Sequence, residues 1–115
     1  MAAIDEYYER TIGEAVRIAL DVVDGNLDEV TEVSSQLRRV AFRPVSTSQP
    51  FLGQPVDAQI IPMTVGVGYI VTVEETDSME PGWWLQDVRM LVNGSPYTTK
   101  PIAVRMVPGV TGLAL

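Results

Sequence analysis

The sequence predicts an all-β protein folded as a sandwich of two sheets. Four separate segments alternate apolar and polar residues with the period of two that is typical of half-buried strands. Each segment is bounded by Gly, Pro, Asn or Asp, and the strand-like segments follow one another at intervals of about ten residues. A chain of 115 residues can form one hydrophobic core but not two ordinary domains. We therefore expect a single domain over residues 1–115, an antiparallel sandwich of about seven strands.

The first alternating segment is predicted to be a strand that ends in a turn. Its apolar residues are Val16, Ile18, Leu20 and Val22. A helical stripe competes with this assignment, and it consists of Ile12, Val16, Ala19 and Val23. The tripeptide Asp24-Gly25-Asn26 favours the strand, because Gly25 can adopt a positive φ in a tight turn. Helical spacing remains an alternative throughout residues 4–43, including a short helix near the N-terminus.

Residues 27–43 fit either a helix or a strand, and we assign a strand. The apolar residues with helical spacing are Val30, Val33, Leu37 and Val40. In the strand assignment, Val33 and Leu37 lie among small polar neighbours. The strand then ends in a basic tip at Arg38, Arg39 and Arg43.

Residues 44–55 are predicted to form a long loop. The segment collects Pro, Ser, Thr, Gln and Gly around Phe51 and Leu52. It is therefore the candidate for a mobile binding loop with one apolar anchor.

The second half of the chain contains the clearest strand patterns. Strands are predicted at residues 56–62, 69–73 and 84–92, and residues 97–99 are expected to open a last strand that includes residues 102–106. Asn93-Gly94 is the type of turn that joins two strands in a hairpin. The tail of residues 108–115 is apolar, and we expect it to pack on a neighbouring subunit.

Four short motifs together resemble the immunoglobulin-like domain at the N-terminus of bacteriophage baseplate upper and tail-fibre proteins. They are residues 13–25 (GEAVRIALDVVDG), 27–31 (LDEVT), 81–88 (PGWWLQDV) and 107–111 (VPGVT). The family typically has an alternating strand before an Asp-Gly turn, a short bend, a Pro-Gly-aromatic opening of the penultimate strand, and a Val-x-Pro-Gly-Val-Thr ending. The chain departs from the family in its loop of residues 44–55 and in having no coiled coil downstream. The resemblance implies an immunoglobulin-like sandwich that works as an attachment module.

Composition excludes most catalytic chemistry and several classes of partner. The chain has no His and no Cys, so the usual general bases, nucleophiles and transition-metal ligands are missing. We expect no enzyme activity and no cofactor. A net charge of -7 repels phosphate backbones and anionic membranes, so neither nucleic acid nor a membrane is an expected partner. The chain also lacks an apolar run long enough to cross a bilayer and a signal-like N-terminus.

Acidic residues cluster in two segments, and both clusters are interpreted as solvated surface. The first consists of Glu74, Glu75, Asp77 and Glu80, and the second of Asp28, Glu29 and Glu32. Neither cluster has the residue spacing of a calcium-binding loop. The sequence also gives no evidence that either cluster forms a glycosidase pocket. Asp87 and Arg89 share one face of a strand, where we expect a structural ion pair.

The two adjacent tryptophans are predicted to face opposite sides of one strand. Trp84 is assigned to the core, together with the alternate residues that follow it. Trp83 then shares the other face with Leu85 and Leu91, where an apolar stripe would attract a partner. The alternative is that residues 4–8 of the same chain cover this stripe. The candidate interface residues are Trp83, Leu85, Leu91, Phe51 and Leu52.

These observations predict a structural component of a bacteriophage particle, made in the host cytoplasm and used in the virion. It would join a tail, baseplate or collar to a fibre or neighbouring subunit, in contact with other virion proteins and with copies of itself in a symmetric assembly. One alternative is a capsid decoration or head–tail completion protein. Another is a small carbohydrate-binding module in which Trp83, Trp84 and Tyr97 stack on sugar rings.

Overall fold

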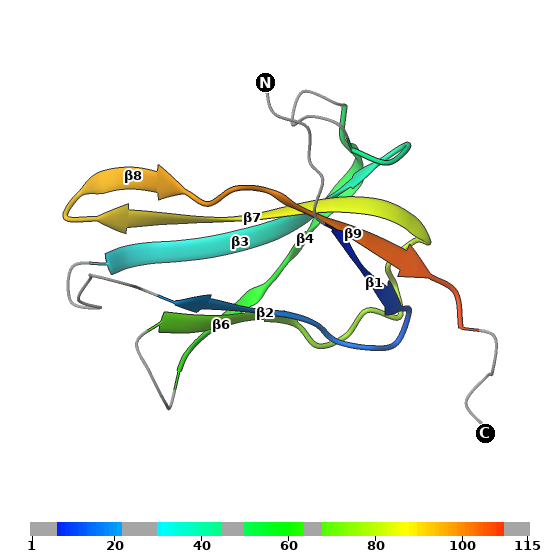
Figure 1. Cartoon of the computed structure of the whole chain (residues 1–115), viewed down its shortest axis with the longest axis horizontal. Helices are drawn as coiled ribbons and strands as arrows, with labels where there is room; N and C mark the ends of the chain where they lie inside the picture. Colours follow the sequence, from blue (N-terminus) through cyan, green and yellow to red (C-terminus); the bar gives the residue numbers. More distant parts are fainter. Residues whose placement is uncertain (1–6, 22–29, 45–49, 64–67, 110–115) are drawn as a thin grey trace.

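The chain folds as two β-sheets packed face to face (Figure 1). The computed structural model describes residues 7–21, 30–44, 50–63 and 68–109. These residues form nine strands and no helix, and none of them belongs to a helix able to cross a membrane. The strands are β1 (Tyr7–Thr11), β2 (Val16–Asp21), β3 (Val30–Val40), β4 (Leu52–Asp57), β5 (Gln59–Pro62), β6 (Gly68–Val73), β7 (Gly82–Val92), β8 (Ser95–Thr98) and β9 (Ile102–Val107). The all-β prediction is confirmed, with more strands than the expected seven or so.

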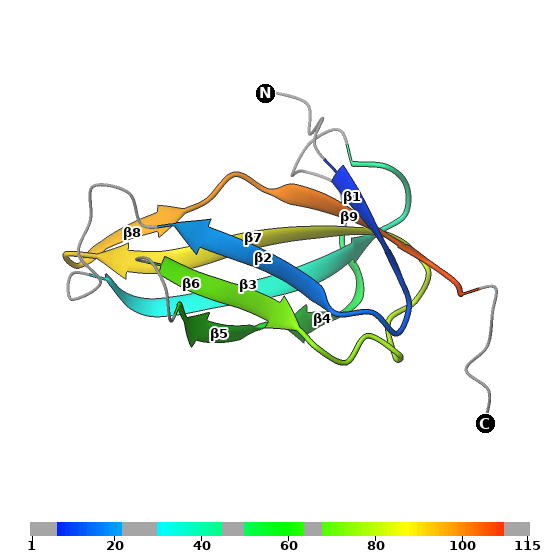
Figure 2. The same cartoon turned by 60° about the horizontal axis from the view of Figure 1, so that its bottom comes forward.

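The order of the strands is that of an immunoglobulin-like sandwich. One sheet runs β1-β9-β7-β3-β4, with β8 paired to β7, and the other runs β2-β6-β5. In immunoglobulin terms, β2, β6 and β5 occupy the places of strands B, E and D. Strands β9, β7, β3 and β4 occupy those of G, F, C and C′. Figure 2 shows β2, β6 and β5 lying across β7 and β3 as the second layer.

Pairing with β6 settles the competition between helix and strand at β2. All six residues of β2 pair antiparallel with β6, from Val16 opposite Val73 to Asp21 opposite Gly68. Val16 is completely buried, whereas Arg17 on the opposite side is exposed. The N-terminal helix alternative is wrong for residues 7–11, which form β1 beside β9. Residues 22–29, with the predicted Gly25 turn, lie outside the described ranges.

Strand β3 is the strand that residues 27–43 were expected to provide. It pairs with β7 on one side and with β4 on the other. Its pairing with β7 shifts between Thr31 and Ser34, and Glu32 has a φ of 53° within this irregularity. The strand ends at Val40, so Arg38 and Arg39 lie within it and Arg43 lies just beyond it.

The predicted loop at residues 44–55 is wrong from Leu52 onward. Residues 52–57 form edge strand β4, which pairs with β3, while residues 45–49 are outside the described part of the chain. Gly53 and Pro55 are typical of loops, but an edge strand tolerates both because one side of its backbone needs no partner. After Ala58 the chain enters β5 in the other sheet, so the single strand expected at residues 56–62 is divided between the two sheets.

The core lies between the sheets in two clusters. Trp84, which is 4% exposed, packs with Val16, Leu37 and Val104 in the first cluster. Its indole Nε1 donates a hydrogen bond to the backbone oxygen of Glu80 at 3.0 Å. The second cluster contains Val30, Val71, Val88 and Met90. The core position predicted for Trp84 is therefore confirmed.

The Asn93-Gly94 hairpin is also confirmed. These two residues join β7 to β8, and Val92 pairs with Ser95 directly across the turn. Asn93 has a φ of 51° and Gly94 a φ of 79°. Positive φ at both central residues is the type I′ geometry that fits the twist of the paired strands.

Candidate protein-binding surface

The outer face of the six-stranded sheet carries the candidate site. Successive side chains of β7 point to opposite faces, so Trp84 points into the core and Trp83 points outward. Pairing of β7 places Trp83 beside Val40 of β3 and Arg105 of β9. The same face therefore collects residues from segments that are far apart in the sequence.

Four side chains form an aromatic–arginine cluster at one end of this face: Tyr7, Arg43, Trp83 and Arg105. The rings of Tyr7 and Trp83 meet edge to face, with centroids 5.2 Å apart. The Arg43 guanidinium lies 4.7 Å from the Tyr7 centroid and 5.8 Å from that of Trp83. The Arg105 guanidinium also lies 5.8 Å from the Trp83 centroid. Cation–π contacts hold both guanidiniums against the rings while their N–H groups can still bond to a partner.

A small apolar layer supports the aromatic–arginine cluster from below. It consists of the buried residues Val40, Leu85 and Ala103, with Trp83 packed against it. Leu85 is only 5% exposed, so it supports the surface and offers little area of its own. Trp83 is half-buried, and Tyr7 of the N-terminal segment provides part of its cover. Cover by the N-terminal segment, one of the two alternatives left open by the sequence, is thus formed in part.

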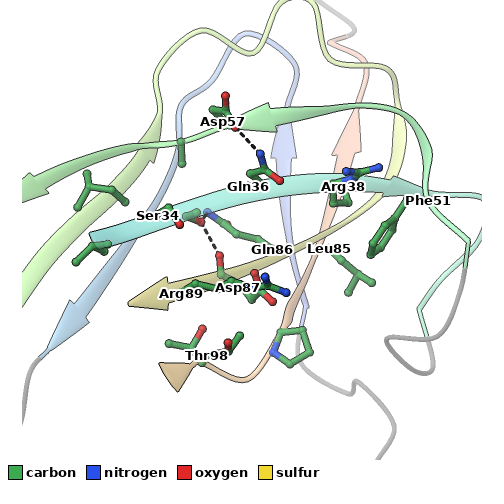
Figure 3. A pocket seen from close by; sticks show the side chains of 16 residues that line it. Ser34, Gln36, Arg38, Phe51, Asp57, Leu85, Gln86, Asp87, Arg89 and Thr98 are labelled. Atoms are coloured by element: carbon green, nitrogen blue, oxygen red, sulfur yellow. Dashed lines mark hydrogen bonds between the residues drawn. The ribbon is translucent and has the colours of Figure 1, made fainter. Parts of the chain in front are cut away.

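A groove of about 850 Å³, lined by both apolar and polar residues, lies on the same face (Figure 3). Phe51, Arg38 and Leu85 lie together on one side of it, and Arg38 is 4.8 Å from the Phe51 centroid. The amide of Gln36 donates a hydrogen bond of 2.7 Å to Asp57, its direct neighbour on β4, and both residues line the groove.

The structure brings together three of the five predicted contact residues. Phe51 and Leu85 line the groove, and Trp83 packs on the same apolar layer as Leu85. Leu91 lies farther along β7, roughly 26 Å from Trp83 for an extended strand, where it lines a separate shallow hollow with Tyr97. Leu52 is 37% exposed on edge strand β4.

Sequence reasoning included Tyr7 only within residues 4–8, the alternative cover of the Trp83 stripe, and it missed Arg105 as a member of the surface. Tyr7 and Arg105 reach Trp83 only because β1 runs parallel to β9 and β9 pairs with β7. No local pattern signals this, since the aromatic contact joins Tyr7 to Trp83, which are far apart in the sequence. The basic tip and Trp83 were visible in the sequence, but the contact of Arg43 with Tyr7 and Trp83 was not.

The expected ion pair between Asp87 and Arg89 is not formed. Within the described residues the ion pairs are Arg17 with Glu74 and Glu9 with Arg105, the second at 3.1 Å. Asp87 and Arg89 both line the groove instead.

Tyr8 lies on the opposite side of β1 from Tyr7 and packs against the first core cluster. Burial raises the pKa of Tyr8 to about 12, so its hydroxyl stays protonated at neutral pH. That hydroxyl donates to the Gln86 side chain at 3.4 Å, and Gln86 in turn donates to Ser35 at 3.4 Å. In the part of the chain that the structure describes, no three acidic side chains are grouped so as to hold a metal ion.

Comparison with known proteins adds no relative. Neither models of known protein families nor curated protein sequences match this chain.

Proposed function

We propose that this protein is a structural module that binds another protein through the outer face of its six-stranded sheet. The observation that carries the proposal is the aromatic–arginine cluster beside the groove. Trp, Tyr and Arg are the residue types that dominate the binding energy of protein interfaces. Their mutual contacts hold the cluster in place before binding, which reduces the side-chain entropy lost on association.

We further propose that the module works in a bacteriophage particle, as an attachment piece between a tail, baseplate or collar and a fibre or neighbouring subunit. Support comes from the resemblance of its motifs and from where they lie in the fold. Gly13 has a φ of 104° in the turn before β2, and Gly82, which follows Pro81, opens β7. Pro108-Gly109 directly follows β9. Three of the four motifs thus have a Gly or Pro at the boundary of a described strand, where these residues have a physical role.

The same geometry weighs against carbohydrate binding. A sugar ring stacks on an open aromatic face. Trp84 is buried, and the ring of Trp83 is already contacted by Tyr7 and two guanidiniums. Of the three aromatic residues expected to stack on sugars, Tyr97 alone is largely exposed, at 57%.

The test is to locate the protein in purified particles. Antibodies against the chain, used in immuno-electron microscopy of particles from cultures that encode it, should label one defined position. Labelling of the tail, baseplate or collar supports the attachment role, and regular labelling of the head would replace it with a capsid role. Particles with no label and no peptides of this chain in mass spectrometry would contradict both.

A substitution pair then tests the surface. Trp83→Ala should reduce incorporation of the folded protein into particles, because it removes the centre of the aromatic–arginine cluster. Tyr97→Ala is the matched control, because Tyr97 is an exposed aromatic residue distant from that cluster. Equal incorporation of both variants would show that the docking surface lies elsewhere.

A further inference from the structure

Strand β2 is an open edge of the three-stranded sheet. It pairs with β6 on one side, and no strand within the described ranges pairs with its other side (Figure 2). An unpaired edge presents a row of backbone N–H and C=O groups that can pair with another strand.

The other edges differ from β2 in a way that matters for pairing. Strands β4, β5 and β8 each contain a proline: Pro55, Pro62 and Pro96. Proline removes a backbone donor and is one of the means by which proteins prevent edge-to-edge association. Strand β2, with the sequence VRIALD, contains neither proline nor glycine. At the remaining edge, β1 already contributes Tyr7 to the aromatic–arginine cluster.

The inward side chains of β2 are only partly covered. Ile18 and Leu20 pack against the second core cluster and yet remain half-exposed, whereas Val16 on the same face is completely buried. A strand added along this edge would bury more of both side chains. Burial of this apolar surface therefore favours the addition of a further strand beside β2.

The order of charges in β2 indicates that the added strand is the β2 strand of a second copy of the chain. When two β2 strands pair antiparallel about a two-fold axis, with Ala19 opposite Ala19, the position of Arg17 in one copy faces that of Asp21 in the other. The symmetry creates this pair of opposite charges twice and places Ile18 opposite Leu20. Moving the axis to residue 18 or 20 places Arg17 opposite Ala19 or Val23, and neither register matches the charges.

Charge matching matters because each copy carries a net charge of -7, which opposes association. Arg17 already pairs with Glu74 of its own chain on the outer surface. A guanidinium has several N–H groups and can bond to a second carboxylate at the same time.

We propose that this protein forms a two-fold dimer in which the β2 strands pair antiparallel, centred on Ala19, and join two three-stranded sheets into one. The pairing uses a backbone edge and leaves the groove on the outer face of the six-stranded sheet open. It is thus independent of the proposed docking surface, and either proposal can fail without the other.

The test exchanges the two charges and follows association by sedimentation equilibrium at several protein concentrations. In Arg17→Asp, both positions of each copy are acidic, so two copies repel. In Asp21→Arg, both positions are basic, with the same result. Each variant alone should dimerise at least about tenfold more weakly than the natural sequence. An equimolar mixture of the two should recover the dimer, since every facing pair is again of opposite charge.

Two measurements make the result decisive. Circular dichroism of each variant shows whether it folds, and recovery in the mixture cannot occur unless both fold. Lys100→Asp is the control for charge alone, because Lys100 is exposed between β8 and β9, away from the β2 edge, and it should dimerise like the natural sequence. A natural chain that is monomeric at every concentration would overturn the proposal. So would a dimer that tolerates both exchanges, or a mixture that stays monomeric.

Discussion

The rings of Tyr7 and Trp83 meet at an angle of 69°, and this contact joins the first described strand of the chain to the opening of β7. Edge-to-face aromatic pairs stabilise by roughly 0.5–1.5 kcal/mol beyond the area they bury. The contact also holds Trp83 in a fixed orientation next to Arg43 and Arg105. One aromatic pair thus contributes to stability and organises the proposed docking surface.

The two adjacent tryptophans should differ in their effect on stability. Trp84→Ala should lower the free energy of unfolding by about 3–5 kcal/mol, because it leaves a cavity in the core and removes the hydrogen bond to Glu80. Trp83→Ala should cost about 1–2 kcal/mol, since its side chain is half-buried and packs on one side only. Urea denaturation of both variants measures the difference. Equal losses would be inconsistent with the opposite orientations of the two side chains.

Two buried threonines offer a test of hydrogen-bond satisfaction. The Thr76 hydroxyl accepts from the Gly13 N–H at 2.8 Å and donates to the Glu14 backbone oxygen at 2.7 Å, so it ties the β1–β2 turn to the segment before β7. Thr76→Val should therefore destabilise by about 1–3 kcal/mol, because a backbone donor and a backbone acceptor lose their partner. Thermal unfolding of the variant measures this loss.

Thr72→Val is the matched control for this change. Thr72 is completely buried as well, but its hydroxyl has no hydrogen-bond partner within the described residues. The nearly isosteric replacement by valine removes an unsatisfied polar atom and should leave stability unchanged or raise it by about 1 kcal/mol. If the two variants were destabilised alike, the difference in hydrogen bonding would not explain the result.

Gly94→Ala should destabilise the hairpin by about 1 kcal/mol through its backbone alone. Gly94 has a φ of 79°, and an added Cβ would meet no other atom within 4 Å. Gly94→Asn should cost less, because asparagine tolerates a positive φ better than alanine does. Melting temperatures of the two variants give the comparison, and an alanine variant as stable as the natural protein would rule out the type I′ turn.

Stability should fall at high pH because of Tyr8. Burial raises the pKa of Tyr8 from 10.0 to about 12, with a smaller opposing effect of Arg10. The folded state thus favours the protonated phenol, and this contribution is complete below pH 10 and is lost as the pH rises from 10 towards 12. The slope is at most about 1.4 kcal/mol per pH unit, reduced by the partial exposure of the ring.

The measurement for Tyr8 compares denaturation of the natural protein with that of Tyr8→Phe across this pH range. The phenylalanine variant cannot ionise at this position, so its stability should decline less steeply. Parallel declines would show that the Tyr8 hydroxyl is as accessible in the folded state as in the unfolded one.

Several features of this protein were determined by local sequence. The alternation in β2 and β7 predicts which side chains face the core, and Trp84 lies there as expected. Asn93-Gly94 predicts the hairpin between β7 and β8 because few residues other than these adopt positive φ at low cost. These features depend on the conformational preferences of neighbouring residues, which can be read from the sequence directly.

The tertiary structure decided what covers each face and which edges remain open. Alternation places Trp83 and Leu85 on one face of β7, but only the pairing of β1 with β9 brings Tyr7 over that face and leaves Leu85 buried. Likewise, residues 52–55 have a loop-like composition and become a strand because β3 offers them a free edge. Such outcomes depend on contacts between segments that are far apart in the sequence. A local pattern of residues carries no information about the free energy of those contacts.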